Sequence, residues 1–183
     1  MIVIKIKQVL FFVTLLVFPH LLFSQNIDFK TSNFKKDKEG LKIAKENIKT
    51  ADELRQKALL MVFDLQDANL VFEQAIFYYN KAQMFNPSNA ELNYKIGSCL
   101  LFTNRKEMAK SYLDRANKIS DNISDDFSFF YGMCLQLDGE YKKAIDSYQY
   151  FKENAKKKII IFCSRFVITI QIADKLIAVK PPA

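Results

Sequence analysis

The sequence has little of the turn chemistry that a β-rich fold requires. Its 183 residues include only 4 glycines and 4 prolines, whereas each short strand of a β-sandwich or barrel needs a turn. An all-β fold is therefore excluded, and a mostly helical chain is expected. Hydrophobic residues make up 50% of the chain and charged residues 26%, a balance typical of a folded domain and not of a disordered or collagen-like chain.

Residues that carry enzyme chemistry are also scarce. Tryptophan is absent, and the single histidine, His20, lies in an N-terminal segment that we expect to be removed. A nucleophile activated by histidine is therefore not available in the mature protein. The three cysteines form no Cys-x-x-Cys pair, and there is no glycine-rich phosphate loop. We therefore predict that the protein is not an enzyme and has no catalytic residue, metal site or cofactor. The carboxylates are interpreted as helix caps and solvated faces.

The net charge of +7 is unevenly distributed along the chain. Residues 25–58 carry 9 bases and 6 acids, residues 59–150 carry 9 bases and 12 acids, and residues 151–183 carry 7 bases and 2 acids. The central body is therefore slightly acidic. Because a nucleic-acid binder concentrates Lys and Arg on its working face, we do not expect nucleic acid as a partner.

The first 24 residues have the features of a secretory signal peptide. Lys5 and Lys7 precede an apolar run over residues 9–18, which Pro19 ends, and this run has the length of a signal-peptide core. Ser24 places the expected cleavage before Gln25. The alternative is an uncleaved anchor over residues 2–23. In the first case the protein is exported.

A periodic pattern runs through the middle of the chain. Small and aromatic residues recur at intervals of 34 and then 35 residues, and Gly97 and Gly132 each stand twelve residues before an alanine of the pattern. This predicts pairs of antiparallel helices, with glycine where the two helices cross most closely. The recurring residues are Ala75, Tyr79, Ala82 and Pro87, then Ala109, Leu113, Ala116 and Asp121, then Ala144, Tyr148 and Phe151.

The pattern resembles the tetratricopeptide repeat, a 34-residue helix-turn-helix unit. The resemblance is strongest over Ala90-Glu91-Leu92-Asn93-Tyr94-Lys95-Ile96-Gly97-Ser98 and continues in Asp138-Gly139-Glu140-Tyr141. Asn93, Phe151 and Phe63 depart from the usual residues of the family. The resemblance implies an all-α solenoid, with an array over residues 50–155 divided into units at about 50–89, 90–124 and 125–155.

Three local patterns predict helix starts independently of the family. Thr50 with Glu53, and Ser88 with Glu91, have the Ser/Thr-x-x-Glu spacing of a capping box. Ser124 is followed by two acids, Asp125 and Asp126, which are favourable in the first turn of a helix.

Two flanking segments are expected to cap the array. Within residues 25–49, Phe34, Leu41, Ala44 and Ile48 are spaced as on an amphipathic helix, which would cover the first repeat. Residues 156–183 form an apolar tail. Its alternating isoleucines resemble a strand, but its setting favours a helix. This tail either packs on the last repeat or is the end of a shortened protein.

The cysteines follow the repeat. Cys99 and Cys134 lie 35 residues apart, at equivalent places in neighbouring helices, which is too far apart for a disulfide. We expect both to be small buried side chains. Cys163 is the candidate for a free thiol or an intermolecular bridge.

The family resemblance also implies a binding groove. In the family this groove is lined by the second, fifth, ninth, twelfth and thirteenth residues of each first helix. The surface implied is apolar and aromatic with an acidic edge, and it suits an amphipathic helix or an extended apolar peptide. Leu101, Phe102 and Leu137 serve equally well as core between repeats. The groove residues predicted here are Glu91, Tyr94, Ser98, Leu101, Phe102, Asp126, Phe129, Met133, Gln136 and Leu137.

The order of signal peptide, leading helix and repeats is similar to the N-terminal region of larger Gram-negative envelope proteins that end in an OmpA-like domain. We therefore expect a non-catalytic scaffold of the periplasm or outer membrane that binds protein partners and no small-molecule substrate. Contact with a membrane would come through an uncleaved N-terminus or a partner. The alternative is a truncated or accessory N-terminal part of an OmpA-family assembly protein associated with the outer membrane and peptidoglycan.

Overall fold

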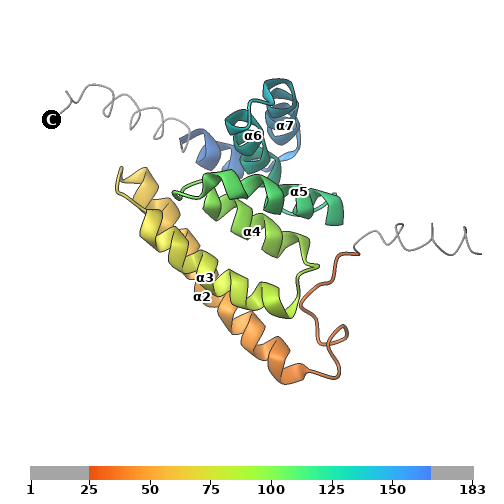
Figure 1. Cartoon of the computed structure of the whole chain (residues 1–183). Coiled ribbons are helices and arrows are strands. Elements are labelled where there is room, and N and C mark those ends of the chain that lie inside the picture. The colour runs from red at the N-terminus through yellow and green to blue at the C-terminus, as the bar shows by residue number, and fades with distance from the viewer. Residues whose placement is uncertain (1–24, 166–183) are drawn as a thin grey trace, which may run out of the picture.

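A computed structural model describes residues 25–165 of the chain, which are helical apart from their connections (Figure 1). The predicted signal peptide, residues 1–24, and the end of the apolar tail, residues 166–183, lie outside the described part. No strand occurs between residues 25 and 165. The helices are α2 (Lys38–Phe63), α3 (Asn69–Phe85), α4 (Ala90–Leu100), α5 (Ala109–Ile119), α6 (Phe127–Leu137) and α7 (Tyr141–Asn154), with a short 3-10 turn, η2 (Lys106–Met108), before α5.

These helices form three antiparallel hairpins, α2/α3, α4/α5 and α6/α7, which stack one after another (Figure 1). Buried alanines of the predicted repeat, Ala75, Ala109 and Ala144, lie in the second helix of each hairpin. The expected all-α solenoid of the tetratricopeptide type is therefore confirmed.

The two glycines of the repeat lie where the helices of a hairpin cross, as the spacing predicted. A Cβ atom at Gly97 would lie 2.7 Å from Cγ of Leu113, and one at Gly132 would lie 2.6 Å from the ring of Tyr148. Both partners are residues of the repeat pattern. Only glycine allows the two helices to approach this closely without displacing a side chain.

The boundary predicted between a leading helix and the first repeat is wrong. Helix α2 is continuous over 26 residues, so residues 25–49 and the first helix of the array are not separate helices. Thr50 does not cap a helix start, because its hydroxyl donates to the carbonyl of Glu46 within α2, at 3.1 Å. The helix begins instead after Asp37, whose side chain accepts from the amide of Gly40 at 2.8 Å.

The segment before α2 covers the junction between the first two hairpins. Phe29 and Phe34 pack on Phe85 at the end of α3, with the ring centroids of Phe34 and Phe85 4.8 Å apart. The carbonyl of Ile27 accepts from the side chain of Asn86 at 2.8 Å. The leading segment therefore stabilises the α3–α4 turn and does not cap the first repeat.

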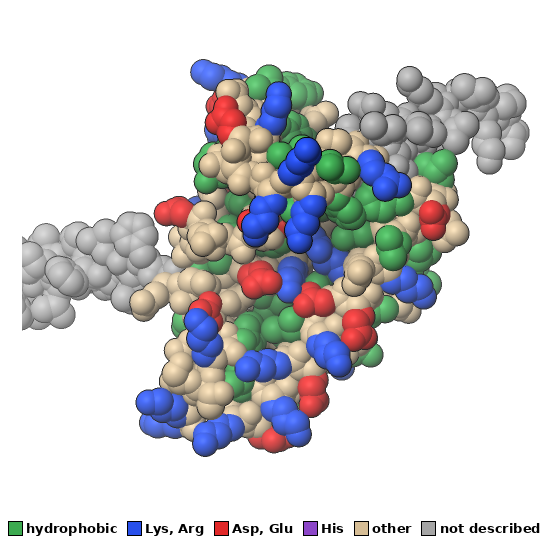
Figure 2. Space-filling model, turned by 180° about the vertical axis from the view of Figure 1, so that it is seen from behind, with side chains coloured by type: hydrophobic (Ala, Val, Ile, Leu, Met, Phe, Trp, Pro, Cys, Tyr) green, Lys and Arg blue, Asp and Glu red, His purple; other side chains and the backbone are tan. Residues whose placement is uncertain are grey.

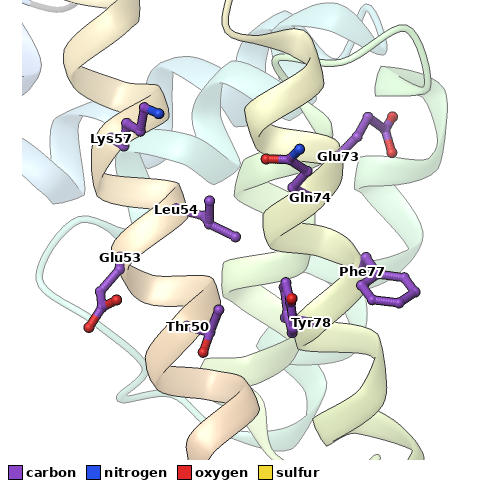
Figure 3. Close-up of a pocket in the computed structure, with 8 residues that line it drawn as sticks. All are labelled: Thr50, Glu53, Leu54, Lys57, Glu73, Gln74, Phe77 and Tyr78. Carbon is purple, nitrogen blue, oxygen red and sulfur yellow. The ribbon is translucent and has the colours of Figure 1, made fainter.

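The outer face of the first hairpin is consequently open. A hollow of about 720 Å³ lies between α2 and α3, and Figure 3 shows it on the side away from the other hairpins. Phe77 is 56% exposed there, with the Lys81 ammonium 4.4 Å from its ring centroid. The residues that line the hollow are Thr50, Glu53, Leu54, Lys57, Glu73, Gln74, Phe77 and Tyr78.

The other two predicted helix starts are displaced by one or more residues. Helix α4 is capped by Asn89 and not by Ser88, since Oδ1 of Asn89 accepts from the amide of Leu92 at 2.8 Å. Helix α6 begins at Phe127, so Asp125 and Asp126 precede its first turn instead of lying in it. The Ser124 hydroxyl donates to the Asp126 carboxylate. A side chain therefore caps α4, whereas no side chain bonds to a first-turn amide of α6.

Residues 157–165 are helical, in agreement with the helix expected for this part of the tail. We refer to them as the C-terminal helix. No helix within residues 25–165 is both long and apolar enough to cross a membrane.

Seen from behind, the surface carries basic and acidic side chains in mixture, and basic side chains gather at the lower end, where α2 begins, as well as in the upper half (Figure 2). Four exposed lysines there fall at helical spacing on one face of α2: Lys38, Lys42, Lys45 and Lys49.

Candidate partner-binding groove

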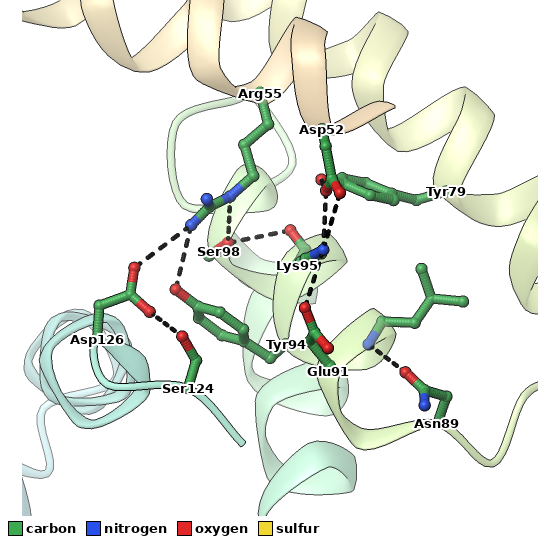
Figure 4. A network of polar contacts seen from close by, with 11 residues as sticks. Asp52, Arg55, Tyr79, Asn89, Glu91, Tyr94, Lys95, Ser98, Ser124 and Asp126 are labelled. Atoms are coloured by element: carbon green, nitrogen blue, oxygen red, sulfur yellow. Dashed lines mark hydrogen bonds and ion pairs between the residues drawn. The ribbon is translucent and has the colours of Figure 1, made fainter. Parts of the chain in front are cut away.

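The side chains of α2, α4 and α6, the first helices of the three hairpins, meet along one groove. Arg55 of α2 lies at its centre and is 16% exposed. Its guanidinium donates to the Tyr94 hydroxyl at 3.1 Å and to the Ser98 hydroxyl at 3.2 Å, and it lies 3.9 Å from the Asp126 carboxylate (Figure 4). One side chain thus joins all three hairpins.

The electrostatic environment keeps Arg55 charged. Burial by itself lowers the pKa of Arg55, but Tyr94, Cys99 and Asp126 raise it by more, and the pKa is raised overall. The guanidinium carbon also lies 5.6 Å from the ring centroids of both Tyr94 and Phe130, a cation–π geometry. The groove floor therefore carries a permanent positive charge that is already satisfied by partners within the chain.

A second polar cluster joins α2, α3 and α4. The carboxylate of Asp52 accepts from the Tyr79 hydroxyl at 2.6 Å and from the Lys95 ammonium at 2.9 Å. Lys95 also contacts the Glu91 carboxylate at 3.0 Å. Burial, with Cys99 and the Asp52 bond, raises the pKa of Tyr79, so its hydroxyl remains a donor.

Towards the start of α2 and α4 the groove is open to solvent. A hollow of about 440 Å³ lies there, with Glu91 and Lys95 on its α4 side and Lys45 and Ile48 on its α2 side. It has charged groups of both signs and an apolar base. Its full lining is Asp28, Phe29, Lys30, Lys45, Ile48, Asn89, Glu91, Leu92 and Lys95.

At the other end, the groove is covered by the C-terminal helix. The Phe162 ring packs edge-on against Phe63 at the end of α2, with centroids 5.0 Å apart, and Lys156 contacts Asp125 next to the start of α6 at 2.8 Å. Cys163 is only 1% exposed. Burial raises the pKa of Cys163 to about 12, with Asp126 adding to the rise and Arg55 opposing it. The tail therefore packs on the first hairpin as well as the last.

The structure divides the ten groove residues predicted from the sequence by exposure. Glu91, Gln136 and Leu137 are exposed, and Phe102, Asp126 and Met133 are half-buried. The remaining four are buried, and for Leu101 this agrees with the alternative of core between repeats: Tyr94, Ser98, Leu101 and Phe129.

The buried residues have physical reasons for their position. Arg55 binds both Tyr94 and Ser98, and burial raises the pKa of Tyr94 well above its usual value although Arg55 opposes the rise. Phe129 faces its own hairpin, where its ring centroid is 5.4 Å from that of Phe151. Phe151 stands where the family usually has alanine, so a large ring on α7 provides a partner that the usual residue would not.

Sequence reasoning missed the residues that organise the groove, Asp52 and Arg55. A signal for Arg55 was present. Leu41, Ala44, Ala51 and Ala58 are the buried stripe of α2, and Arg55 lies within that stripe, four residues after Ala51. A charged residue on an otherwise apolar stripe indicates a buried ion pair.

The cysteines are all free and buried. The expectation of buried side chains is confirmed for Cys99 and Cys134. Cys163 is a free thiol, one of the two alternatives expected for it, and the C-terminal helix turns it inward. Burial raises the pKa of Cys99 to about 12 and that of Cys134 to about 11. No group of three potential metal ligands is found among residues 25–165.

A comparison with protein families finds a match over the central hairpin. The tetratricopeptide repeat model matches residues 90–123, the span of α4, η2 and α5. Residues 90–123 are a tetratricopeptide repeat. Tetratricopeptide repeats are in general non-catalytic modules for protein–protein interaction, and the α4 wall of the groove belongs to this repeat. No curated protein and no solved structure matches the chain.

Proposed function

We propose that the protein is a non-catalytic scaffold of the bacterial cell envelope that binds a peptide or helix of a protein partner in the groove. The supporting observation is the groove itself: a tetratricopeptide repeat forms one wall, and an apolar helix of the chain already lies in one half of it. The open half, around Glu91 and Lys95, is the surface left for a partner.

The charges of the open half define the partner's chemistry. Among its lining residues Lys30 is paired with Asp28 at 2.6 Å and Lys95 with Glu91 at 3.0 Å. The remaining charge is that of Lys45, and lysines continue along α2. The apolar base is formed by Ile48, Phe29 and Leu92. A partner segment with acidic residues beside an apolar face satisfies both features.

The test uses a photo-crosslinking amino acid at Glu91, in the full chain expressed in its native host. We expect a discrete crosslinked species in the envelope fraction, which is lost when Lys45 and Lys95 are both changed to Glu. The same amino acid at Glu107, which is exposed on η2, serves as the control. Identical crosslinks from Glu107, or none from Glu91, would count against the groove.

Export is a separate part of the proposal and rests on the composition of residues 1–24. The mass of the protein purified from its native host tests it. A mature chain that begins near Gln25 supports export, and an intact Met1 in a cytoplasmic fraction excludes it.

The alternative role, as an N-terminal or accessory part of an OmpA-family assembly protein, is favoured by the order of a signal-like segment followed by repeats. It predicts coding sequence for an OmpA-like domain adjacent to this one. Reading the neighbouring sequence in all frames distinguishes the two proposals.

A further inference from the structure

The C-terminal helix follows α7 after only two residues, Ala155 and Lys156, yet it leaves the last hairpin and reaches the first. Its contacts include Lys156 on Asp125, Phe162 on Phe63, the Arg165 guanidinium 6.0 Å from the Phe63 ring centroid, and Cys163 in the interior. Ile159 and Ile160 are partly buried against the same core. The helix therefore lies in the groove as a bound peptide would.

The contacts of this helix differ from those that hold α7. Helix α7 is locked by the Gly132–Tyr148 crossing and by the buried Phe151. The Lys156–Asp125 pair is 70% and 45% exposed, and such a pair contributes little to stability. Phe162 is only half-buried. Apart from the buried Cys163, the C-terminal helix is thus held by more exposed side chains than α7 is.

The surface beneath the helix is partly apolar, around Phe63, and its polar part is satisfied without the helix. Arg55 keeps its bonds to Tyr94 and Ser98 and its contact with Asp126 within α2, α4 and the start of α6. Exposing this network to water leaves no buried charge without a partner, so departure of the helix does not carry the large cost of orphaning an ion. The hairpins can stay folded while the groove opens.

From this geometry we infer that the C-terminal helix is an internal ligand of the groove, which a partner helix of the same pattern displaces. The pattern is a basic residue at the helix start, a phenylalanine six positions later and a small apolar side chain directly after the phenylalanine. In this chain these are Lys156, Phe162 and Cys163. This inference deepens the proposed function and rests on it. Because a tethered segment has an effective concentration in the millimolar range, only a better-matched partner competes.

Cys163 reports the docked state in the full chain. It is the only cysteine on the C-terminal helix, and Cys99 and Cys134 lie in α4 and α6. We expect a maleimide to label Cys163 under native conditions before the other two. Phe162→Ala should accelerate labelling of Cys163 at least tenfold. Ile161→Ala, at a 53% exposed position of the same helix, is the matched control and should change the rate less than threefold.

Equal labelling rates for the three cysteines would mean that the helix leaves only when the whole protein unfolds, and this would overturn the inference. So would a Phe162→Ala protein whose Cys163 remains as protected as in the unchanged chain.

A peptide supplied in trans tests the groove directly. The probe is a fluorescent peptide with the sequence of residues 154–165, carrying Cys163→Ala to remove its thiol. Fluorescence anisotropy should detect binding to the full-length Phe162→Ala protein at a concentration at least tenfold lower than to the unchanged protein. The same peptide with its own Phe162 changed to Ala should not bind.

Failure of this inference is distinguishable from failure of the proposed function. If the peptide binds neither protein while Glu91 still crosslinks a partner, the internal-ligand inference is wrong and the scaffold proposal stands. If the peptide binds the Phe162→Ala protein and Glu91 crosslinks nothing, the groove accepts a helix but the proposed envelope partner is wrong.

Discussion

The first and second hairpins differ in how deeply their first helices are buried. Helix α4 has 11 residues, nine of which are buried, whereas α2 has 26 residues and only five are buried. The reason is position in the stack: α4 has a hairpin on each side, while the outer face of α2 and α3 is open around Phe77. Most residues of α4, in the central repeat, are thus packed in the core. The first hairpin instead has long exposed surfaces and contributes Asp52 and Arg55, the charged residues that organise the groove.

The largest effect on the free energy of unfolding is expected when a leucine is introduced into the second hairpin, and the same change in the first hairpin serves as the comparison. Gly97→Leu places atoms where Leu113 already lies and should lower the free energy of unfolding by about 3 kcal/mol. Gln74→Leu adds a leucine to the open hollow of the first hairpin and should change it by less than about 0.5 kcal/mol. Urea denaturation of both variants gives the two values.

Equal losses would mean that the first hairpin is packed as tightly as the second, and the contrast between them would fail. No loss from Gly97→Leu would show that α4 and α5 do not cross at this residue.

The next largest effect on stability concerns Arg55, one of the residues that join the first two hairpins. Arg55→Met keeps the length of the side chain but removes the bonds to Tyr94 and Ser98, and we expect a loss of about 2 kcal/mol. The loss should be smaller than for a fully buried pair because the Asp126 side chain is 20% exposed and can regain water. The exposed Arg115 of α5 offers the control Arg115→Met, with little change expected.

Hydrogen exchange sharpens this result. Amides of α2 should exchange faster in the Arg55→Met protein, while those of α4 keep their protection. Uniform acceleration throughout the chain would indicate that the hairpins unfold as one unit and that Arg55 is not a local coupling between them.

What the sequence could predict was the part set by short-range packing. The spacing of Gly97 and Gly132 to the alanines and large side chains downstream specifies helix crossings, because only one residue type fits there. The hairpins and their order followed from that pattern. The family resemblance named Glu91 and Gln136 among the groove residues, and both are exposed.

What it could not predict depends on contacts between distant parts of the chain. Tyr94 has the position of a groove residue but is buried, because Arg55, 39 residues earlier, binds its hydroxyl. The Thr50 pattern matched a helix start, yet no glycine or proline interrupts residues 41–63, so the helix continues through it. Phe162 meets Phe63 across almost a hundred residues, and no local pattern encodes that pairing.

A smaller loss of folding stability is expected at alkaline pH, and it arises from Cys99 in the central repeat. Burial raises the pKa of Cys99 from 9.0 to about 12, so the folded state holds its proton where the unfolded state has lost it. This contribution to stability is complete below pH 9 and is lost as the pH rises from 9 towards 12. Between pH 8 and pH 10 the loss amounts to about 1.3 kcal/mol.

The Cys99→Ala protein should therefore lose about 1 kcal/mol less than the unchanged protein over that interval. Urea unfolding at the two pH values measures the difference. If both proteins lose the same amount, Cys99 is not protected in α4 and the deep burial of that helix is in error.

The smallest effect separates a true helix cap from a residue inside a helix. Asn89→Ala removes the acceptor for the Leu92 amide at the start of α4 and should cost about 1 kcal/mol. Thr50→Ala lies in the interior of α2, where Thr is a weak helix former and its hydroxyl only bonds back to Glu46, so we expect a change of a few tenths of a kcal/mol in the stabilising direction. Thermal unfolding of the two variants measures both changes. A cost of about 1 kcal/mol for Thr50→Ala would instead indicate that a helix begins there, dividing α2 into a leading helix and a first repeat that could move independently of each other.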